Sequence, residues 1–263
     1  MPTATDAELE EHLLRAPLRV IGRLVASSNQ AVLMEADGAY AIHKPITLER
    51  PLWDYPPGTL ARRERAAYLV CAGMGLSLVP PTVLREGPWG LGSLQLWIGE
   101  PGTPLPGVVT VCAQDEVPRG WLEVLRGHEE GGRAVCLAHA DTPEVRSAVL
   151  LDAVLNNSDR KGGHLGIGPQ GLRGFDHGVS LGSQPKLRTV LWGWAGDPLS
   201  DADLGHLETL TGALRGTGLA DELGALLEPS EVDALNARIR RLRRTRRYPV
   251  PAPNWPAIPW PAM

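Results

Sequence analysis

Four charged residues spread along the chain have the types and the order that phosphoryl transfer from ATP requires. Lys44 ends a stretch with strand alternation, and Glu64 lies on the helix expected next, where it could pair with the lysine. Asp159 and Asp176 follow in short polar stretches beside glycines. The reaction needs a lysine that holds the phosphates, an acidic partner for that lysine, a carboxylate that orients the acceptor hydroxyl and a metal ligand. The four residues therefore favour a phosphotransferase site.

Lysine is rare in this chain, so the positions of its lysines are informative. Of 26 lysine and arginine residues only three are lysines, namely Lys44, Lys161 and Lys186. If arginine is the default cation, lysine stays where a compact point charge is needed instead of a planar fork. Lys44 and Lys161 fall beside the acidic residues named above, and Lys186 follows Asp176 by ten residues. Chance scatter is the alternative, and these neighbours favour function.

The first hundred residues have the pattern of a small antiparallel sheet with one main helix. Thr5 and Glu8 form a capping box at the start of a helix over 5–16. A proline-rich loop over 45–60 leads into a second helix over 62–73. The strands that alternation and turn residues predict are 19–26, 30–35, 39–43, 82–85 and 93–98. The glycine- and proline-rich stretch 99–107 marks a boundary, so residues 1–100 form the expected N-lobe.

Residues 101–263 form the expected C-lobe, which is mostly helical. Segments 121–125 and 133–138 can pair as a hairpin. Thr142-Pro143 starts a helix that runs to about residue 155, and further helices start near residues 200 and 229. The loop over 156–164 is so polar that burying it without a ligand would be costly. The chain ends in a tail rich in proline and tryptophan from residue 249. The fold class expected is α+β, with two lobes.

Composition limits the kinds of binding partner and the cellular compartment that we expect for this protein. The net charge of −4 does not favour nucleic acid, and no apolar run reaches the roughly 18 residues of a membrane helix. Three cysteines without CxxC spacing favour a reducing environment, so we expect a cytoplasmic protein with no membrane span. The seven arginines of 238–247 are expected on a solvated helix face, with an anionic partner as the alternative.

Several longer strings resemble a known family. They are similar to an actinobacterial family of phosphatidylinositol 3/4-kinase-like proteins and, more distantly, to HipA-like kinases. The matching strings span nearly the whole chain: His43-Lys44-Pro45, 49–53, 79–82, 156–164, Phe175-Asp176-His177-Gly178, 186–192 and 255–261. The resemblance implies a protein-kinase-like fold of the atypical type, with ATP and a divalent metal, Mg²⁺ or Mn²⁺, as cofactors.

The resemblance also implies a role for each candidate residue. Lys44 would contact the nucleotide phosphates and be oriented by Glu64, while Asp159 would be the catalytic aspartate, assisted by Lys161. Asp176 would bind metal. Residues 94–100 would be the hinge segment that reads adenine. The nucleotide contacts expected besides Lys44 and Glu64 are Ser27, Ser28, Gln95, Trp97 and Ile98.

Two positions depart from the pattern of that family. Lys161 stands two residues after Asp159, where atypical kinases often carry histidine. His164 stands five residues after Asp159, where they carry a metal-binding asparagine. Imidazole binds Mn²⁺ readily and suits Mg²⁺ poorly, so His164 is expected as a second ligand with a preference for Mn²⁺. The alternative hypothesis is a pseudokinase, a nucleotide-binding regulatory or partner-binding module.

The segment after Asp176 carries the expectation about the acceptor. Lys186 and Arg188 would lie beside the incoming hydroxyl, with Trp192 and Trp194 as a flat apolar wall. Two cations favour an anionic small molecule, such as a phosphorylated sugar or cyclitol, although a protein serine or threonine stays open. The alternative is that both cations pair with nearby acidic residues such as Asp197 or Asp201.

Overall fold

A five-stranded antiparallel sheet occupies the N-terminal third of the computed structural model, which describes residues 4–24, 30–216 and 218–263. Its strand order is β1-β2-β3-β5-β4, so β3 is central. The strands are β1 (Leu18–Arg23), β2 (Val32–Ala36), β3 (Ala39–Pro45), β4 (Thr82–Gly87) and β5 (Gly90–Leu96). Each of the five predicted strands is present, with ends that differ by at most three residues.

The two faces of this sheet are covered differently. Helix α1 (Asp6–Arg15) covers one face, where Leu13 packs on Met34 and Leu94, and the predicted capping box of Thr5 and Glu8 starts the helix. Ile42 lies on the other face, together with Leu33 and Trp97. Side chains alternate along a strand, so Lys44 shares the face of Ile42. The lysine therefore points away from α1 and toward the rest of the chain.

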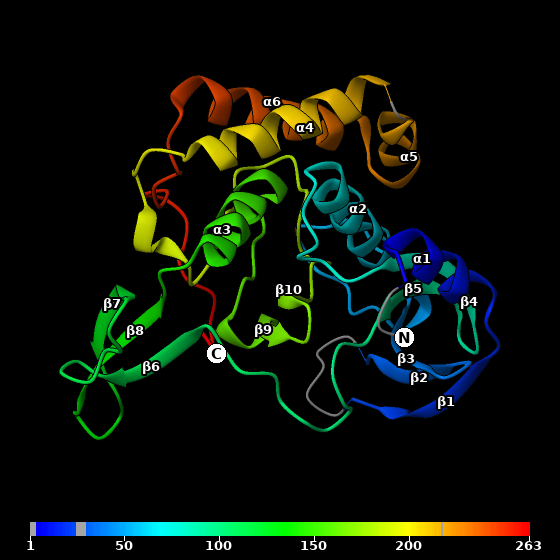
Figure 1. Ribbon diagram of the computed structural model, residues 1–263, viewed down its shortest axis with the longest axis horizontal. Helices are drawn as coiled ribbons and strands as arrows, with labels where there is room; N and C mark the ends of the chain where they lie inside the picture. Colours follow the sequence, from blue (N-terminus) through cyan, green and yellow to red (C-terminus); the bar gives the residue numbers. More distant parts are fainter. Residues whose placement is uncertain (1–3, 25–29, 217) are drawn as a thin grey trace.

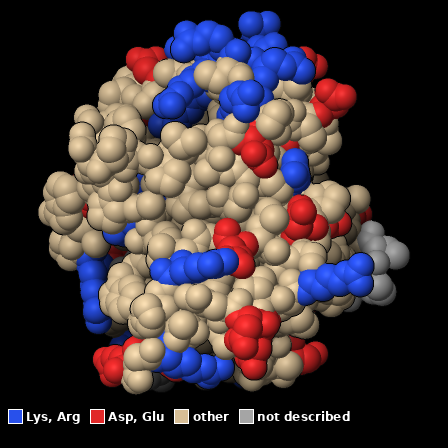
Figure 2. All heavy atoms as spheres, turned by 90° about the vertical axis from the view of Figure 1, so that its left-hand side faces the viewer, with Lys and Arg blue, Asp and Glu red and all other residues tan. Residues whose placement is uncertain are grey.

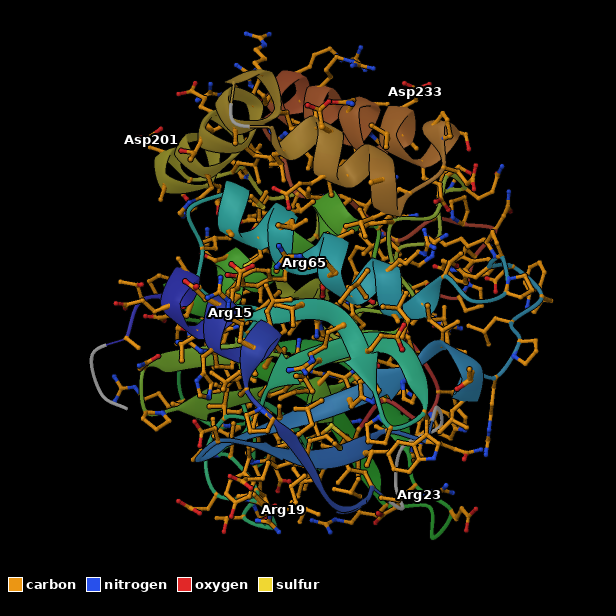
Figure 3. All side chains as sticks on the ribbon, turned by 90° about the vertical axis from the view of Figure 1, so that its right-hand side faces the viewer. Arg15, Arg19, Arg23, Arg65, Asp201 and Asp233 are labelled. Atoms are coloured by element: carbon orange, nitrogen blue, oxygen red, sulfur yellow. The ribbon has the colours of Figure 1, made fainter. Side chains whose placement is uncertain are left out.

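Helix α2 (Leu60–Gly73) connects this sheet to the helical part of the molecule. Arg65 on α2 forms an ion pair with Glu10 of α1 and donates to the carbonyl oxygen of Thr82 at 2.7 Å. Figure 3 shows Arg65 on α2 above α1, whose C-terminal end is marked by Arg15. On its other side α2 packs against α4 and α5, and a Cβ at Gly73 would lie 2.8 Å from Leu219. Helix α2 is thus held from both sides.

A second antiparallel sheet follows in the order β6-β8-β7 and projects to the lower left in Figure 1. Its strands are β6 (Val109–Ala113), β7 (Trp121–His128) and β8 (Ala134–Ala140). The predicted hairpin is confirmed as β7 and β8, whereas β6 was not predicted. Helix α3 (Pro143–Leu155) begins as predicted, with the Thr142 hydroxyl accepting from the amide of Val145 at 3.4 Å.

The remaining elements surround α3 and build the large core. The hairpin of β9 (Leu165–Gly168) and β10 (Gly171–Gly174) follows the polar loop. Helices α4 (Asp201–Gly216), α5 (Leu219–Leu226) and α6 (Pro229–Thr245) form a layer over α2 and α3 at the top of Figure 1. The tail then returns to the polar loop, where the amide of Gly162 donates to the carbonyl oxygen of Ala262 at 2.8 Å. The α+β class is confirmed, and the lobe boundary near residue 100 stays a prediction.

Charge is unevenly distributed over the outer layer. The last turns of α6 and the residues after it expose six arginines: Arg240, Arg241, Arg243, Arg244, Arg246 and Arg247. Figure 2 shows lysine and arginine side chains gathered at the top of its face, where the α4–α6 layer lies. Arg238 differs from the expected solvated face, because it donates inward to the carbonyl oxygen of Val154 at 2.8 Å. No helix in the ranges described is long and apolar enough to cross a membrane.

Candidate functional site

Three elements meet at the amine of Lys44. The lysine extends from the end of β3, and its Nζ forms ion pairs with Oε1 of Glu64 on α2 and, at 2.7 Å, with Oδ1 of Asp176. The second oxygen of Glu64 accepts from the backbone amide of His177 at 2.9 Å. The Glu64 side chain is 3% exposed and that of Asp176 is 41% exposed. The lysine thus joins a buried carboxylate to a carboxylate that faces solvent.

The electrostatics keep Lys44 and Asp176 charged. Burial alone would lower the pKa of Lys44, but the carboxylates of Asp176 and Glu64 outweigh it, so that pKa lies above its ordinary value. The charge of Lys44 in turn lowers the pKa of Asp176, against the opposing effect of burial. An ammonium group is therefore held ready at the end of β3, where anionic phosphate oxygens could replace Asp176 as its partner.

The β9–β10 hairpin brings His164 next to Asp176. The backbone amide of Phe175 donates to the carbonyl oxygen of His164 at 2.9 Å, and Asp176 adopts a left-handed φ of 58°. The Nε2 atom of His164 then lies 3.6 Å from Oδ2 of Asp176. Burial lowers the pKa of His164 despite the nearby carboxylate, so the imidazole is neutral at pH 7. Its two nitrogens remain available as a ligand and as a donor.

Asp159 lies between two cations in the polar loop after α3. Its backbone amide donates to the side chain of Asn157 at 3.0 Å. Its carboxylate has Nζ of Lys161 at 3.2 Å on one oxygen and a guanidinium nitrogen of Arg188 at 3.7 Å on the other. The Asp159 side chain is 24% exposed. Asp159 therefore stays accessible from solvent in a positively charged setting.

A buried network fixes the loop on which Asp159 stands. Arg160 donates to both carboxylate oxygens of Asp152 on α3, at 2.8 to 3.1 Å, and to the carbonyl oxygen of Phe175 at 3.1 Å. The Nη2 atom of Arg160, one of the two nitrogens that donate to Asp152, also lies 2.7 Å from Nε2 of His177. Arg160 thus ties the loop of Asp159 to the residues on both sides of Asp176. A bidentate, buried guanidinium–carboxylate pair gives such a tie a defined geometry.

The donor set suits a metal ion shared with nucleotide phosphates. The ranges described contain no group of three or more His, Cys, Asp and Glu side chains placed to hold a metal alone. Asp176 and His164 converge as two potential ligands, and Mg²⁺ or Mn²⁺ is commonly held by one or two protein groups with phosphates and water. The residues therefore fit a divalent ion that arrives with a nucleotide.

The residues expected to contact adenine are only partly placed near Lys44. Gln95 and Trp97 share the sheet face of Lys44, but the Gln95 amide donates to the hydroxyl of Thr82 at 2.8 Å. The indole nitrogen of Trp97 is buried and has no hydrogen-bond partner among the described residues. Ile98 packs so closely on the β9–β10 hairpin that a Cβ at Gly168 would lie 2.6 Å from it. The expected contacts Ser27 and Ser28 lie outside the described residues.

Two neighbouring hollows lie in the region of Lys44 and Glu64. A narrow crevice is lined by Lys44, Pro45, Glu49, Leu60, Ala61, Glu64 and Gly178. A larger cavity of about 290 Å³ is lined entirely by residues between 46 and 60 and shares Glu49 and Leu60 with the crevice. The larger cavity contains none of the four charged residues that led the sequence argument. Of the two hollows, only the crevice is lined by residues of this group, namely Lys44 and Glu64.

Comparison with known proteins places the chain in a family. The Mycobacterium tuberculosis protein Rv2133c is 42% identical over 268 residues, which cover 97% of this chain and 96% of that protein. The chain belongs to the family of Rv2133c. No family model matches the chain. The crystal structure of the Helicobacter pylori proinflammatory kinase CtkA aligns with 90% of this chain and 94% of that one, at a TM-score of 0.48 and 10% identity. Values this low establish no shared activity.

This member of the Rv2133c family uses Lys186 in a way that the sequence did not indicate. Its Nζ donates to Asp54 at 2.9 Å and lies 4.8 Å from the ring centre of Trp53 and 5.7 Å from that of Trp255. Lys186 therefore already has an acidic partner and aromatic neighbours within the protein, and these contacts disfavour the expected role of Lys186 as an acceptor contact. The alternative that Lys186 pairs with an acidic residue therefore holds, but the partner is Asp54, 132 residues earlier in the chain, and not Asp197 or Asp201. The aromatic residues of 53–55 were a signal, since tryptophan and tyrosine faces attract cations.

Arg188 is placed differently from Lys186. Its Nε donates to the carbonyl oxygen of Ser158 at 2.6 Å, and its Nη2 lies 3.7 Å from Oδ1 of Asp159. Trp192, expected as a flat wall for the acceptor, donates from its indole nitrogen to the carbonyl oxygen of Ala257 at 2.8 Å. Trp194 is buried in the main core. Of the four residues expected around the acceptor, only Arg188 is in contact with Asp159.

Proposed function

We propose that the protein is an ATP-dependent phosphotransferase with a kinase-like arrangement of its site. One observation carries the proposal: Lys44 on the third strand is paired with Glu64 on the following helix, and Asp176 lies against the same amine. Protein kinases require a lysine of the third strand paired with a helical glutamate, together with a metal-binding aspartate. Here those three side chains come from positions up to 132 residues apart in the chain.

The contacts support a separate role for each of these residues. Lys44 would hold the phosphates of ATP, and Glu64 would keep the amine in place. Asp159 would orient the acceptor hydroxyl and take its proton as a bond forms from the hydroxyl oxygen to the γ-phosphorus and the bond to the β-phosphate oxygen breaks. Lys161 and Arg188, next to Asp159, would stabilise the negative charge of the transferred group. A divalent ion bound by Asp176 would supply further neutralisation of the phosphates.

The acceptor class follows from the charge around Asp159. Because Lys161 and Arg188 are both within 4 Å of this carboxylate, an acceptor that carries its own phosphate or carboxylate would be attracted to the same place. A phosphorylated sugar or cyclitol has such a group beside a hydroxyl. This acceptor agrees with the resemblance to phosphatidylinositol 3/4-kinase-like proteins without requiring a lipid. Lys186 is not needed for this attraction, because Asp54 already balances its charge.

One observation favours a second candidate, a pseudokinase that binds nucleotide without turnover. His164 occupies the place of a metal-binding asparagine, and burial lowers the pKa of its imidazole. A poor Mg²⁺ ligand at this position would weaken catalysis more than nucleotide binding. The retained carboxylates of Asp159 and Asp176 favour the enzyme over this alternative.

The experiment separates nucleotide binding from turnover. ATP affinity is measured by calorimetry and γ-phosphate transfer by a screen of phosphorylated sugars and cyclitols, each with Mg²⁺ and with Mn²⁺. Lys44→Met should weaken ATP binding, while Asp159→Asn should keep the affinity and lower turnover by a factor of about 100 or more. Asp54→Asn, outside the proposed catalytic group, serves as the control. Binding without turnover in any metal identifies the pseudokinase, and absence of ATP binding refutes both proposals.

A further inference from the structure

We infer that a buried ion pair between Arg63 and Glu231 is the positioning device that holds helix α2 where Glu64 meets Lys44. This inference rests on the proposed function, because it concerns the same lysine–glutamate pair. Arg63 is the residue before Glu64 on α2, and Glu231 lies in the first turn of α6. Neither residue touches the crevice at Lys44, so both would act through Glu64.

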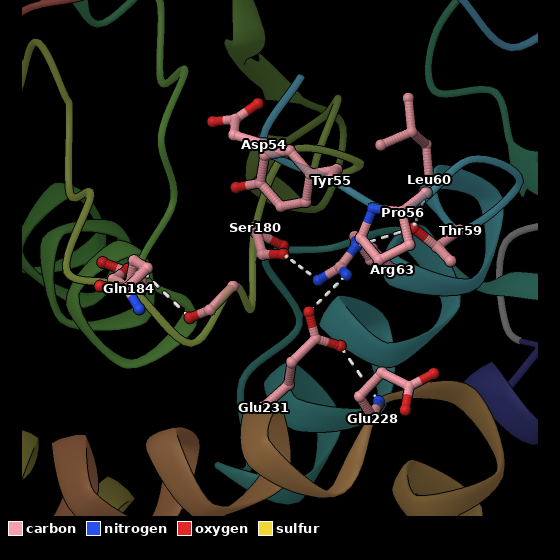
Figure 4. A network of polar contacts seen from close by, with 12 residues as sticks. Asp54, Tyr55, Pro56, Thr59, Leu60, Arg63, Ser180, Gln184, Glu228 and Glu231 are labelled. Atoms are coloured by element: carbon pink, nitrogen blue, oxygen red, sulfur yellow. Dashed lines mark hydrogen bonds and ion pairs between the residues drawn. The ribbon is translucent and has the colours of Figure 1, made fainter. Parts of the chain in front are cut away.

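The geometry around Arg63 is that of a complete clamp (Figure 4). One guanidinium nitrogen donates to Oε1 of Glu231 at 2.5 Å and another to the carbonyl oxygen of Ser180 at 2.9 Å. The ring of Tyr55 lies 4.7 Å from the guanidinium carbon, and the Arg63 side chain is 1% exposed. A planar fork fits several fixed acceptors at once, which a flexible ammonium cannot do in the same way.

The partners of Arg63 are themselves fixed. The second oxygen of Glu231 accepts from the backbone amide of Glu228 at 3.1 Å, as part of the capping box that starts α6. Ser180 donates from its hydroxyl to the carbonyl oxygen of His177 at 2.6 Å. His177 follows Asp176 directly and donates its amide to Glu64. One guanidinium therefore joins α2, the segment after Asp176 and the start of α6.

A second fixation of α2 comes from the side of the sheet. The carboxylate of Glu49 accepts from the amides of Leu60 and Ala61 at 3.2 and 2.8 Å, and so caps the first turn of the helix. Glu49 holds the start of α2 from the loop after β3, and Arg63 holds it one turn later from the helical layer. Glu64 follows both attachments directly along the helix, so its position is set by polar contacts of defined length.

Stability alone is a weak reason for such a pair. Replacing both members of a buried ion pair by apolar residues is often neutral or stabilising, whereas removing one member is destabilising. An apolar contact of similar size would hold α2 with less definition of its position along the helix axis. The kinase-like chemistry proposed above requires the lysine–glutamate pair to be in place, and the position of this helix controls it. The pair of Arg63 and Glu231 fixes the position of α2 along its axis in this way.

The experiment compares the double variant Arg63→Met with Glu231→Leu against each single variant and the wild type. Three quantities are measured: urea stability, hydrogen exchange of the α2 amides relative to those of α3, and ATP affinity with Mn²⁺. Arg65→Met is the matched control, because Arg65 lies on the same helix and pairs with Glu10 of α1 and, at 3.5 Å, with Glu222 of α5 instead of with α6. The control should lower stability without changing ATP affinity.

We expect the double variant to regain most of the stability that the single variants lose. Its α2 amides should nevertheless exchange faster than in the wild type and its ATP affinity should be about 10-fold weaker, a size typical of coupled sites. Recovery of stability together with wild-type exchange and wild-type affinity would show that the pair is only structural. Should the wild type bind no ATP, the proposed function fails, while the exchange of α2 still decides whether the clamp positions this helix.

Arg63→Lys provides a variant that keeps the buried charge. A lysine can reach Glu231 or the carbonyl oxygen of Ser180 but cannot present the fork to both. Exchange of α2 and ATP affinity should fall between those of the wild type and the double variant. If Arg63→Lys has the α2 exchange and the ATP affinity of the wild type, the guanidinium group is not needed to join Glu231 and Ser180 to α2.

Discussion

Replacing Lys44 by methionine tests whether the buried carboxylate of Glu64 depends on this lysine. The change removes an amine that contacts two carboxylates and keeps a side chain of similar length. Asp176, which is 41% exposed, can be solvated after the change, so its lost contact costs about 0–1 kcal/mol. Glu64 is 3% exposed and, among the described residues, keeps only the bond from the His177 amide, and breaking a buried pair costs about 3–5 kcal/mol. Because the Lys44 side chain is itself 17% exposed, water can partly replace it, and we expect a total of about 3 kcal/mol.

The assay is urea denaturation of Lys44→Met, Glu64→Gln and the double variant, with the urea slope compared among them. Glutamine keeps an oxygen for the His177 amide and removes the charge that would otherwise be stranded. The double variant should therefore be more stable than Lys44→Met, with a coupling of about 2 kcal/mol between the two positions. If the coupling is below about 0.5 kcal/mol, the pair contributes no specific interaction and Lys44 is not held by Glu64.

Three further predictions concern single side chains. Burial, with a smaller effect of Arg85, lowers the pKa of His43 from 6.5 to about 4. The unfolded chain therefore binds the proton first, and stability should fall by about 3 kcal/mol as the pH drops from about 6.5 to about 4. His43→Leu should flatten this dependence in urea titrations at several pH values. His164→Asn should shift the metal preference of ATP turnover from Mn²⁺ toward Mg²⁺, and an unchanged preference would remove His164 from the metal site. Arg188→Ala should raise the acceptor KM at unchanged ATP KM, whereas Lys186→Ala should lower the midpoint of urea unfolding; equal effects on the acceptor KM would contradict this distinction.

Local patterns were sufficient for most elements of the fold. The start of α1 was predicted because a capping box consists of two residues three positions apart. The start of α3 was predicted because Thr142 precedes a proline. Strand β6 was missed, since five residues that pair only with β8 give too short an alternation. Helix α5 was missed because eight residues form a helix only through packing, here against α2, α4 and α6.

The candidate site could be anticipated in part for a similar reason. The order of Lys44, Glu64, Asp159 and Asp176 along the chain matched a known chemistry, and the structure brings the first, second and fourth into contact. The partner of Lys186 could not be found in this way, because Asp54 lies in a proline-rich loop far away in sequence. Contacts between distant loops depend on how the core packs, so they cannot be predicted from the spacing of residues within a short segment.

The loop over 156–164 shows what burial can and cannot indicate about a ligand. Its polar side chains led to the expectation that a ligand must balance them. The structure balances several of them internally: the Asn156 amide donates to the carbonyl oxygens of Gly182 and Gln184, and Arg160 and the Asn157 amide both bond to Asp152. The burial of these residues therefore requires no ligand.

The case for a ligand rests instead on the side chains of Asp159 and His164, which this internal network leaves partly exposed and loosely paired. Asp159 has cations at 3.2 and 3.7 Å, which is a loose arrangement compared with the bonds of 2.8 to 3.1 Å that Arg160 makes to Asp152. His164 stands 3.6 Å from Asp176, beyond a hydrogen bond, and its Nδ1 has no partner among the described residues. Where a rigid network supports charged groups that are only loosely paired with each other, a further charged group can enter without breaking a strong bond. A nucleotide phosphate with its metal ion has the charges that such a place would bind.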